Sequence, residues 1–110
     1  MRRRSLPCSV RYSPEARDDL VNILDYISGE LMNPAAAARI VRAIYGKIDL
    51  LAEHPDLGRE LPESVAAGFP CRHFTAENYR IFYRIEGSDI SVVRILHSLR
   101  NHMKVLFGEE

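Results

Sequence analysis

Cysteine, lysine and long apolar runs are scarce in this chain of 110 residues, and each shortage excludes a class of protein. Two cysteines, Cys8 and Cys71, with no C-x-x-C spacing, exclude a disulfide scaffold and indicate reduced thiols in the cytosol. No run of about eighteen apolar residues is present, which excludes a membrane-spanning helix. The opening MRRRSLPCSV is basic and lacks an apolar core, so we expect no secretory signal.

Metal ligands and net charge are also lacking. Among the four histidines only His97 and His102 lie close in sequence, and they have no third ligand, so we expect no metal and no cofactor. The net charge of zero is unevenly spread, because residues 13–63 hold ten acids and five bases whereas residues 71–104 hold six bases and three acids. Such a split is typical of a partner-binding face, and equally of ordinary scatter on a small protein.

Two amphipathic helices follow a short strand predicted at residues 8–13. Ser13 is placed to cap the first helix and Pro14 suits its first turn, and Asn33 with Pro34 repeats this start for the second. Apolar residues at helical spacing form one stripe on each helix: Ala16, Leu20, Ile23, Leu24, Ile27 and Leu31, then Ala37, Ile40, Val41, Ile44, Ile48 and Leu51. The tight connection predicts an antiparallel helical hairpin.

Three strands are predicted after a proline-rich loop at residues 55–70: residues 71–75, 79–86 and 89–97. Gly87-Ser88 suits a two-residue hairpin turn, which pairs Glu86 with Asp89, Ile81 with Arg94 and Arg80 with Ile95. One face of the hairpin then receives Tyr79, Ile81, Tyr83, Ile85, Ile90, Val92, Arg94 and Leu96, and the other receives Arg80, Phe82, Arg84, Ser91, Val93, Ile95 and His97. The first face should pack on the helices, and the second should be open to water or to a partner.

Arg94 is the misfit on the apolar face. Its guanidinium either extends past the edge of the core, or a β-bulge turns it away.

The element order predicts an α+β fold, in which an N-terminal strand, an antiparallel helical hairpin and a three-stranded antiparallel meander form one small, mostly antiparallel sheet with the helices on one face. We expect one domain over residues 1–110, with tails at residues 1–7 and 102–110.

The segments YSPEARDDLVNILDYI, HPDLGRELP and NYRIFYRIEGSDISVVRILHSLRN, in this order, resemble the RelE/ParE superfamily of bacterial toxins from type II toxin–antitoxin pairs. The resemblance runs from Val10 to Asn101, and the HPDLGR element and the two long helices are closer to the ParE branch. It implies a cytoplasmic toxin that inhibits growth and is silenced by a cognate antitoxin in a hetero-oligomer. ParE-type members act on DNA gyrase, the expected target here, whereas RelE-type members cut mRNA in the ribosome. A third alternative is a relic that binds its antitoxin without being toxic.

The ribonuclease alternative needs an acid, a base and cations for the developing phosphorane charge. Arg80, Arg94 and Arg100 are its candidate cations, and His97 is its candidate acid or base. The chain, however, has only two lysines, no tyrosine follows Tyr83, and the zero net charge disfavours unspecific nucleic-acid binding. We therefore lean toward a toxin that is not an enzyme and assign no catalytic residue.

A protein-binding surface is the preferred interpretation of the second face. Basic side chains would pair with acidic groups of a partner, and apolar neighbours would add contact area. The candidate partner-binding residues are Arg80, Phe82, Arg84, Val93, Ile95, His97 and Arg100. Each of them alone is equally well explained as keeping an open sheet face soluble. We expect no membrane contact and no sequence-specific nucleic-acid binding.

Overall fold

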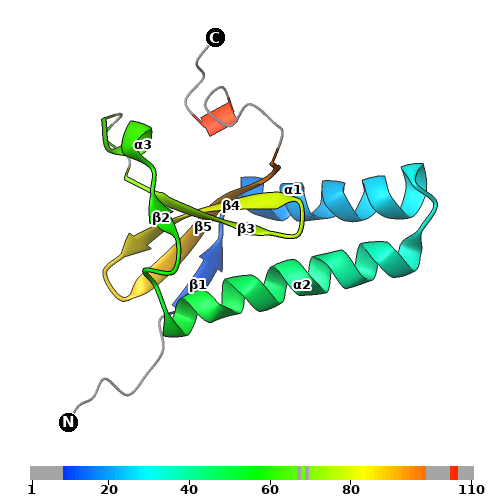
Figure 1. The fold of residues 1–110 in the computed structure, drawn as a ribbon, viewed down its shortest axis with the longest axis horizontal. Coiled ribbons are helices and arrows are strands. Elements are labelled where there is room, and N and C mark those ends of the chain that lie inside the picture. The colour runs from blue at the N-terminus through cyan, green and yellow to red at the C-terminus, as the bar shows by residue number, and fades with distance from the viewer. Residues whose placement is uncertain (1–8, 67, 69, 99–104, 107–110) are drawn as a thin grey trace.

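The computed structural model describes residues 9–66, 68, 70–98 and 105–106, and its element order confirms the predicted α+β class (Figure 1). The elements are β1 (Ser9–Tyr12), α1 (Pro14–Asp25), a π-helical turn η1 (Tyr26–Glu30), α2 (Pro34–Glu53), β2 (Arg59–Glu60), α3 (Pro62–Ala66), β3 (Arg72–Ala76), β4 (Tyr79–Glu86) and β5 (Asp89–His97). The predicted bounds of β4 and β5 are confirmed, and β3 begins and ends one residue later than predicted. Cys8, the predicted start of the first strand, lies outside the described residues.

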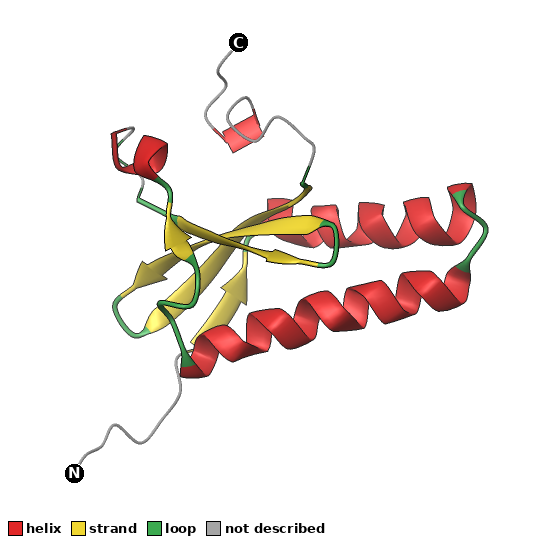
Figure 2. Ribbon diagram, in the orientation of Figure 1, coloured by secondary structure: helices red, strands yellow, loops and turns green. Residues whose placement is uncertain are grey.

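The five strands form one sheet in the order β1-β5-β4-β3-β2. All neighbouring pairs are antiparallel except β1 with β5, whose parallel pairing places Ser9 opposite Asp89 and Tyr12 opposite Val92. The helices α1 and α2 lie side by side as a hairpin on one face, and their joined ends extend beyond the sheet (Figure 2). In the described part of the chain, no helix is long and apolar enough to cross a bilayer.

The predicted helix caps are confirmed. The Ser13 hydroxyl oxygen accepts a hydrogen bond from the Ala16 amide at 2.9 Å, and the Asn33 side chain accepts one from Ala36 at 3.1 Å. Most of both apolar stripes packs on the sheet as expected, but Leu24 and Leu31 are 40% and 56% exposed. Leu24 lies one helical step outside the buried stripe, and Leu31 follows the end of η1.

A β-bulge overturns the predicted register at one end of the hairpin. Glu86 pairs with Asp89 and Tyr83 with Val92, as the predicted register requires, but Phe82 pairs with Arg94, so that Val93 has no opposite residue on β4. Beyond this extra residue every side chain of β5 changes face. The partners predicted for Ile81 and Arg80 are therefore wrong, because Ile81 lies opposite Ile95 and Arg80 lies opposite Leu96.

The bulge also corrects the predicted faces. Ile95 and His97 join the face that packs on the helices. Arg94 and Leu96 move to the opposite face, here called the far face, beside Phe82. The far face is also less open than predicted, because part of it carries a second buried cluster: Leu61, Cys71, Phe82 and Leu96, against which Val105 and Leu106 pack. Full burial of a large apolar side chain contributes about 1.5–3 kcal/mol, which favours covering the centre of this face.

The stretch after α2 is anchored by Tyr83, which is fully buried. Its hydroxyl donates to the Pro55 carbonyl at 2.7 Å and accepts from the Gly58 amide at 2.8 Å. Arg72 donates to the Gly58 carbonyl at 2.6 Å. A Cβ on Gly58 would lie 2.7 Å from the His73 carbonyl oxygen and 2.8 Å from a Tyr83 ring carbon, so the chain requires glycine at this close approach. This packing gives the HPDLGR stretch a structural reason.

Replacing Gly58 by alanine should lower the free energy of unfolding by about 1–3 kcal/mol, because the added methyl group would clash with the β3 backbone and the Tyr83 ring and push the loop away from both. Gly46→Ala is the matched control. A Cβ at Gly46 meets nothing within 4 Å, and alanine in the interior of α2 should stabilise the chain by about 0.5–1 kcal/mol. Urea unfolding of both variants measures the difference, and equal midpoints would contradict the packing argument.

Candidate partner-binding site

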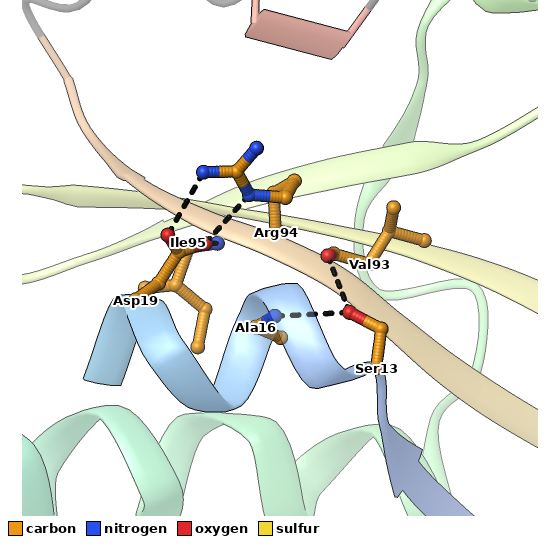
Figure 3. Close-up of polar contacts among 6 residues, drawn as sticks. All are labelled: Ser13, Ala16, Asp19, Val93, Arg94 and Ile95. Carbon is orange, nitrogen blue, oxygen red and sulfur yellow. Dashed lines mark hydrogen bonds and ion pairs between the residues drawn. The ribbon is translucent and has the colours of Figure 1, made fainter. Parts of the chain in front are cut away.

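The bulge on β5 is held by a carboxylate from α1 (Figure 3). Asp19 accepts hydrogen bonds from Arg94 Nε at 2.8 Å and Nη2 at 2.9 Å, and the oxygen that binds Nε also accepts from the Ile95 amide at 2.9 Å. The Asp19 side chain is 8% exposed and that of Arg94 is 21% exposed. The predicted alternative in which a bulge turns Arg94 away is therefore confirmed.

Ser13 holds the other side of the bulge. Its hydroxyl donates to the Val93 carbonyl at 2.7 Å while its oxygen caps α1 through the Ala16 amide, as Figure 3 shows. The Ser13 amide also donates to the Val92 carbonyl at 2.9 Å. The backbone groups around the bulge are thus satisfied by the first two turns of α1, which fixes the position of α1 on β5.

The Arg94 guanidinium is consequently fixed in place by its ion pair with Asp19. Its hydrogen bonds to Asp19, with the negative charges of Asp19 and Glu15, raise the pKa of Arg94 although burial acts in the opposite direction. The bidentate geometry directs its donors toward α1 and away from the centre of the far face.

Two adjoining hollows lie beside the Asp19–Arg94 contact, between the helical hairpin and the end of the β4–β5 pair. Their volumes are about 330 and 390 Å³, and both are lined by Tyr26, Tyr79 and His97. We call them together the aromatic groove. The rings of Tyr79 and His97 meet edge to face with centroids 5.5 Å apart. Burial raises the pKa of the Tyr79 hydroxyl above its ordinary value.

Polar side chains lie at both ends of the aromatic groove. Asp19 and Asn22 line the end beside α1, and Asn33 and Glu77 line the end beside the helix connection. Glu77 stands in the turn between β3 and β4 with a φ of 58°, a conformation that non-glycine residues seldom adopt. The groove therefore combines aromatic faces with carboxylates.

The predicted partner-binding residues are divided between the two faces of the sheet. Arg80, Phe82 and Arg84 lie on the far face, whereas Ile95 and His97 lie on the helix side. Phe82 is fully buried and Ile95 is 2% exposed, so in this structure neither side chain offers a partner appreciable area. Arg84 Nε lies 3.7 Å from Glu86.

The remaining predicted residues complete this picture. Val93 is half-buried at the bulge, and Arg100 lies outside the described residues. The described members of the candidate ribonuclease set are not brought together, because Arg80 and His97 are on opposite faces and Arg94 is bound to Asp19.

Four residues line the groove that the sequence did not indicate as site residues: Tyr26, Tyr79, Glu77 and Asp19. The detectable signal was Asp19, an acid that falls within the apolar stripe of α1 three residues after Ala16 and four before Ile23. An acid on one apolar face and an arginine on another would together have indicated a buried pair. The groove residues carry no comparable signal, because only the fold brings them together.

Removing the Asp19 carboxylate should be among the most destabilising polar changes in the chain. Asp19→Ala leaves the Ile95 amide and the Arg94 guanidinium without acceptors, and should lower the free energy of unfolding by about 3 kcal/mol. Asp18→Ala removes an exposed neighbouring acid and should change it by less than about 0.5 kcal/mol. Chemical denaturation of these variants, of Arg94→Met and of the double variant Asp19→Ala/Arg94→Met should give a double-variant loss smaller than the sum of the Asp19→Ala and Arg94→Met losses. Additive losses would show that the two side chains are not coupled.

Comparison with known proteins places this geometry in a family. Residues 10–102 match the family described as the ParE toxin of the type II toxin-antitoxin system parDE. Toxin RelE3 and Toxin ParE1 of Caulobacter vibrioides are each 32% identical to this chain over 91 residues, which is 83% of this chain and 95% and 90% of theirs. The fold is similar to a solved chain of the chromosomal ParDE system of P. aeruginosa, with a TM-score of 0.68, 25% identity, and coverage of 82% of this chain and 95% of that one. The chain therefore belongs to the ParE toxin family of type II toxin–antitoxin systems.

Proposed function

We propose that this chain inhibits bacterial growth in the cytoplasm by binding DNA gyrase. A cognate antitoxin neutralises the chain by binding to it. The family match supports the toxin class. The choice of a protein target over RNA cleavage rests on one observation, the separation of the charged groups that cleavage would need. Arg94 is bound to Asp19, and His97 lies on the face opposite Arg80.

The surface suits protein binding. Large apolar side chains stay exposed along α1, η1 and the turn that follows: Val21, Leu24, Tyr26, Leu31 and Met32, which are between 40% and 83% exposed. Exposed apolar residues that gather on one element mark interaction sites more often than chance scatter does. The outer side of the hairpin is therefore a candidate surface for the antitoxin.

Arg80 is the candidate for contact with gyrase. Its Nε is buried and has no hydrogen-bond partner among the described residues. A buried donor without an acceptor costs free energy in the chain alone, and a carboxylate from a partner can complete its hydrogen bonding. Arg84 on the same strand face adds a second positive charge, so this face suits an acidic surface.

The purified chain, freed from its antitoxin, should inhibit DNA supercoiling by gyrase, and adding the antitoxin should restore it. Arg80→Ala should raise the inhibitory concentration about tenfold, because arginines at protein interfaces are frequent hot spots. Lys47→Ala, which removes an exposed base on α2, should leave it within about twofold.

Full supercoiling activity in the presence of a folded wild-type chain would refute gyrase as the target. Cleavage of mRNA on ribosomes by the same preparation would then favour the ribonuclease alternative.

A further inference from the structure

We infer that the aromatic groove receives a cationic side chain, arginine or lysine, from the antitoxin. The inference rests on the proposed neutralisation and adds the chemistry of one contact. The groove would attract a positive group, whereas the basic far face would attract a negative one.

The ring faces provide the first argument. Tyr26, Tyr79 and His97 line both hollows, and Tyr26 is 53% exposed on η1, where a partner can reach it. Tyrosine rings attract a cation placed over their faces, and arginine also stacks on them through its planar guanidinium. Three rings around one space are more than an aliphatic side chain needs.

Charge provides the second argument. Among the described residues that line the aromatic groove there are two carboxylates, Asp19 and Glu77, and no lysine or arginine. Apart from Asp19, whose charge Arg94 offsets, the adjoining α1 and η1 carry four acids against one arginine. Their summed field favours a positive group in the groove and disfavours a negative one.

Glu77 is the carboxylate available for this contact. Both Asp19 oxygens are engaged at the bulge, whereas among the described residues the ion pair of Glu77 is with Arg39 at 3.7 Å, and the Arg39 side chain is 62% exposed. Exposed ion pairs of this kind contribute little and exchange readily. The chain also keeps a glutamate at a positive φ, where glycine or asparagine would fit a turn with less strain. A contact with a partner cation gives that strained position a function.

A peptide titration tests the cation chemistry without the antitoxin. The full chain, isotopically labelled, receives acetyl-Gly-Arg-Gly-amide or the same peptide with citrulline, which matches arginine in shape and carries no charge. The arginine peptide should shift the NMR signals of Tyr26, Tyr79 and His97, and the citrulline peptide should shift them several-fold less. Equal shifts from both peptides, or no shift at these residues, would overturn the inference.

Charge reversal tests the role of the groove in antitoxin binding. Glu77→Lys should raise the dissociation constant for the antitoxin about tenfold, whereas Glu53→Lys, the same change at the exposed end of α2, should alter it less than about twofold. Tyr26→Leu should raise this constant about fivefold, and Tyr26→Phe, which keeps a ring face, should change it by less than about twofold. Calorimetric titration measures all four, with thermal unfolding to confirm that each variant is folded.

The outcomes separate the inference from the proposed function. If the antitoxin binds the wild-type chain but Glu77→Lys binds equally or more tightly, the cationic contact is wrong and neutralisation stands. If the antitoxin fails to bind the wild-type chain, the proposed neutralisation is wrong and the assignment of the groove to the antitoxin fails with it.

Discussion

The Asp19 carboxylate is the group on which the arrangement of this domain depends. The extra residue in β5 turns the Ile95 amide and the Arg94 guanidinium toward α1, and one carboxylate accepts hydrogen bonds from both. Ser13 satisfies the Val93 carbonyl at the same bulge. Because these acceptors and donors belong to the first turns of α1, the bulge and the helix position stabilise each other. The register of β5 beyond the bulge, and with it the face on which His97 lies, follows from this contact.

A second anchor lies toward the other edge of the sheet, beside β3 and β2. The Tyr83 hydroxyl joins Pro55 and Gly58, and the close approach at Gly58 brings the loop after α2 against β3. The helical hairpin is thus connected to the sheet at both of its ends, by α1 on β5 and by the loop that follows α2. Exposed apolar side chains lie along α1, η1 and the turn that follows, among them Val21, Tyr26 and Met32.

The two faces of the sheet differ in chemistry as a result. Arginines surround a covered apolar centre on the far face, while rings and carboxylates line the groove on the helix side. The far face therefore suits an acidic partner, whereas the groove suits a basic one. Asp19 links the two faces, because it lines the groove on the helix side and binds Arg94 of the far face.

The sequence by itself determined the local elements: the Ser13 and Asn33 caps, both helices, the strand bounds of β4 and β5, and the turn that pairs Glu86 with Asp89. These follow from side-chain periodicity and capping chemistry within a few residues. The tertiary structure alone decided the bulge, the faces of Ile95, Leu96 and His97, the parallel pairing of β1 and the aromatic groove. Alternation along a strand assumes an unbroken period of two, whereas the groups that stabilise the bulge lie 75 residues away in sequence on another element. Only packing α1 against β5 brings those groups together, and no local pattern records it.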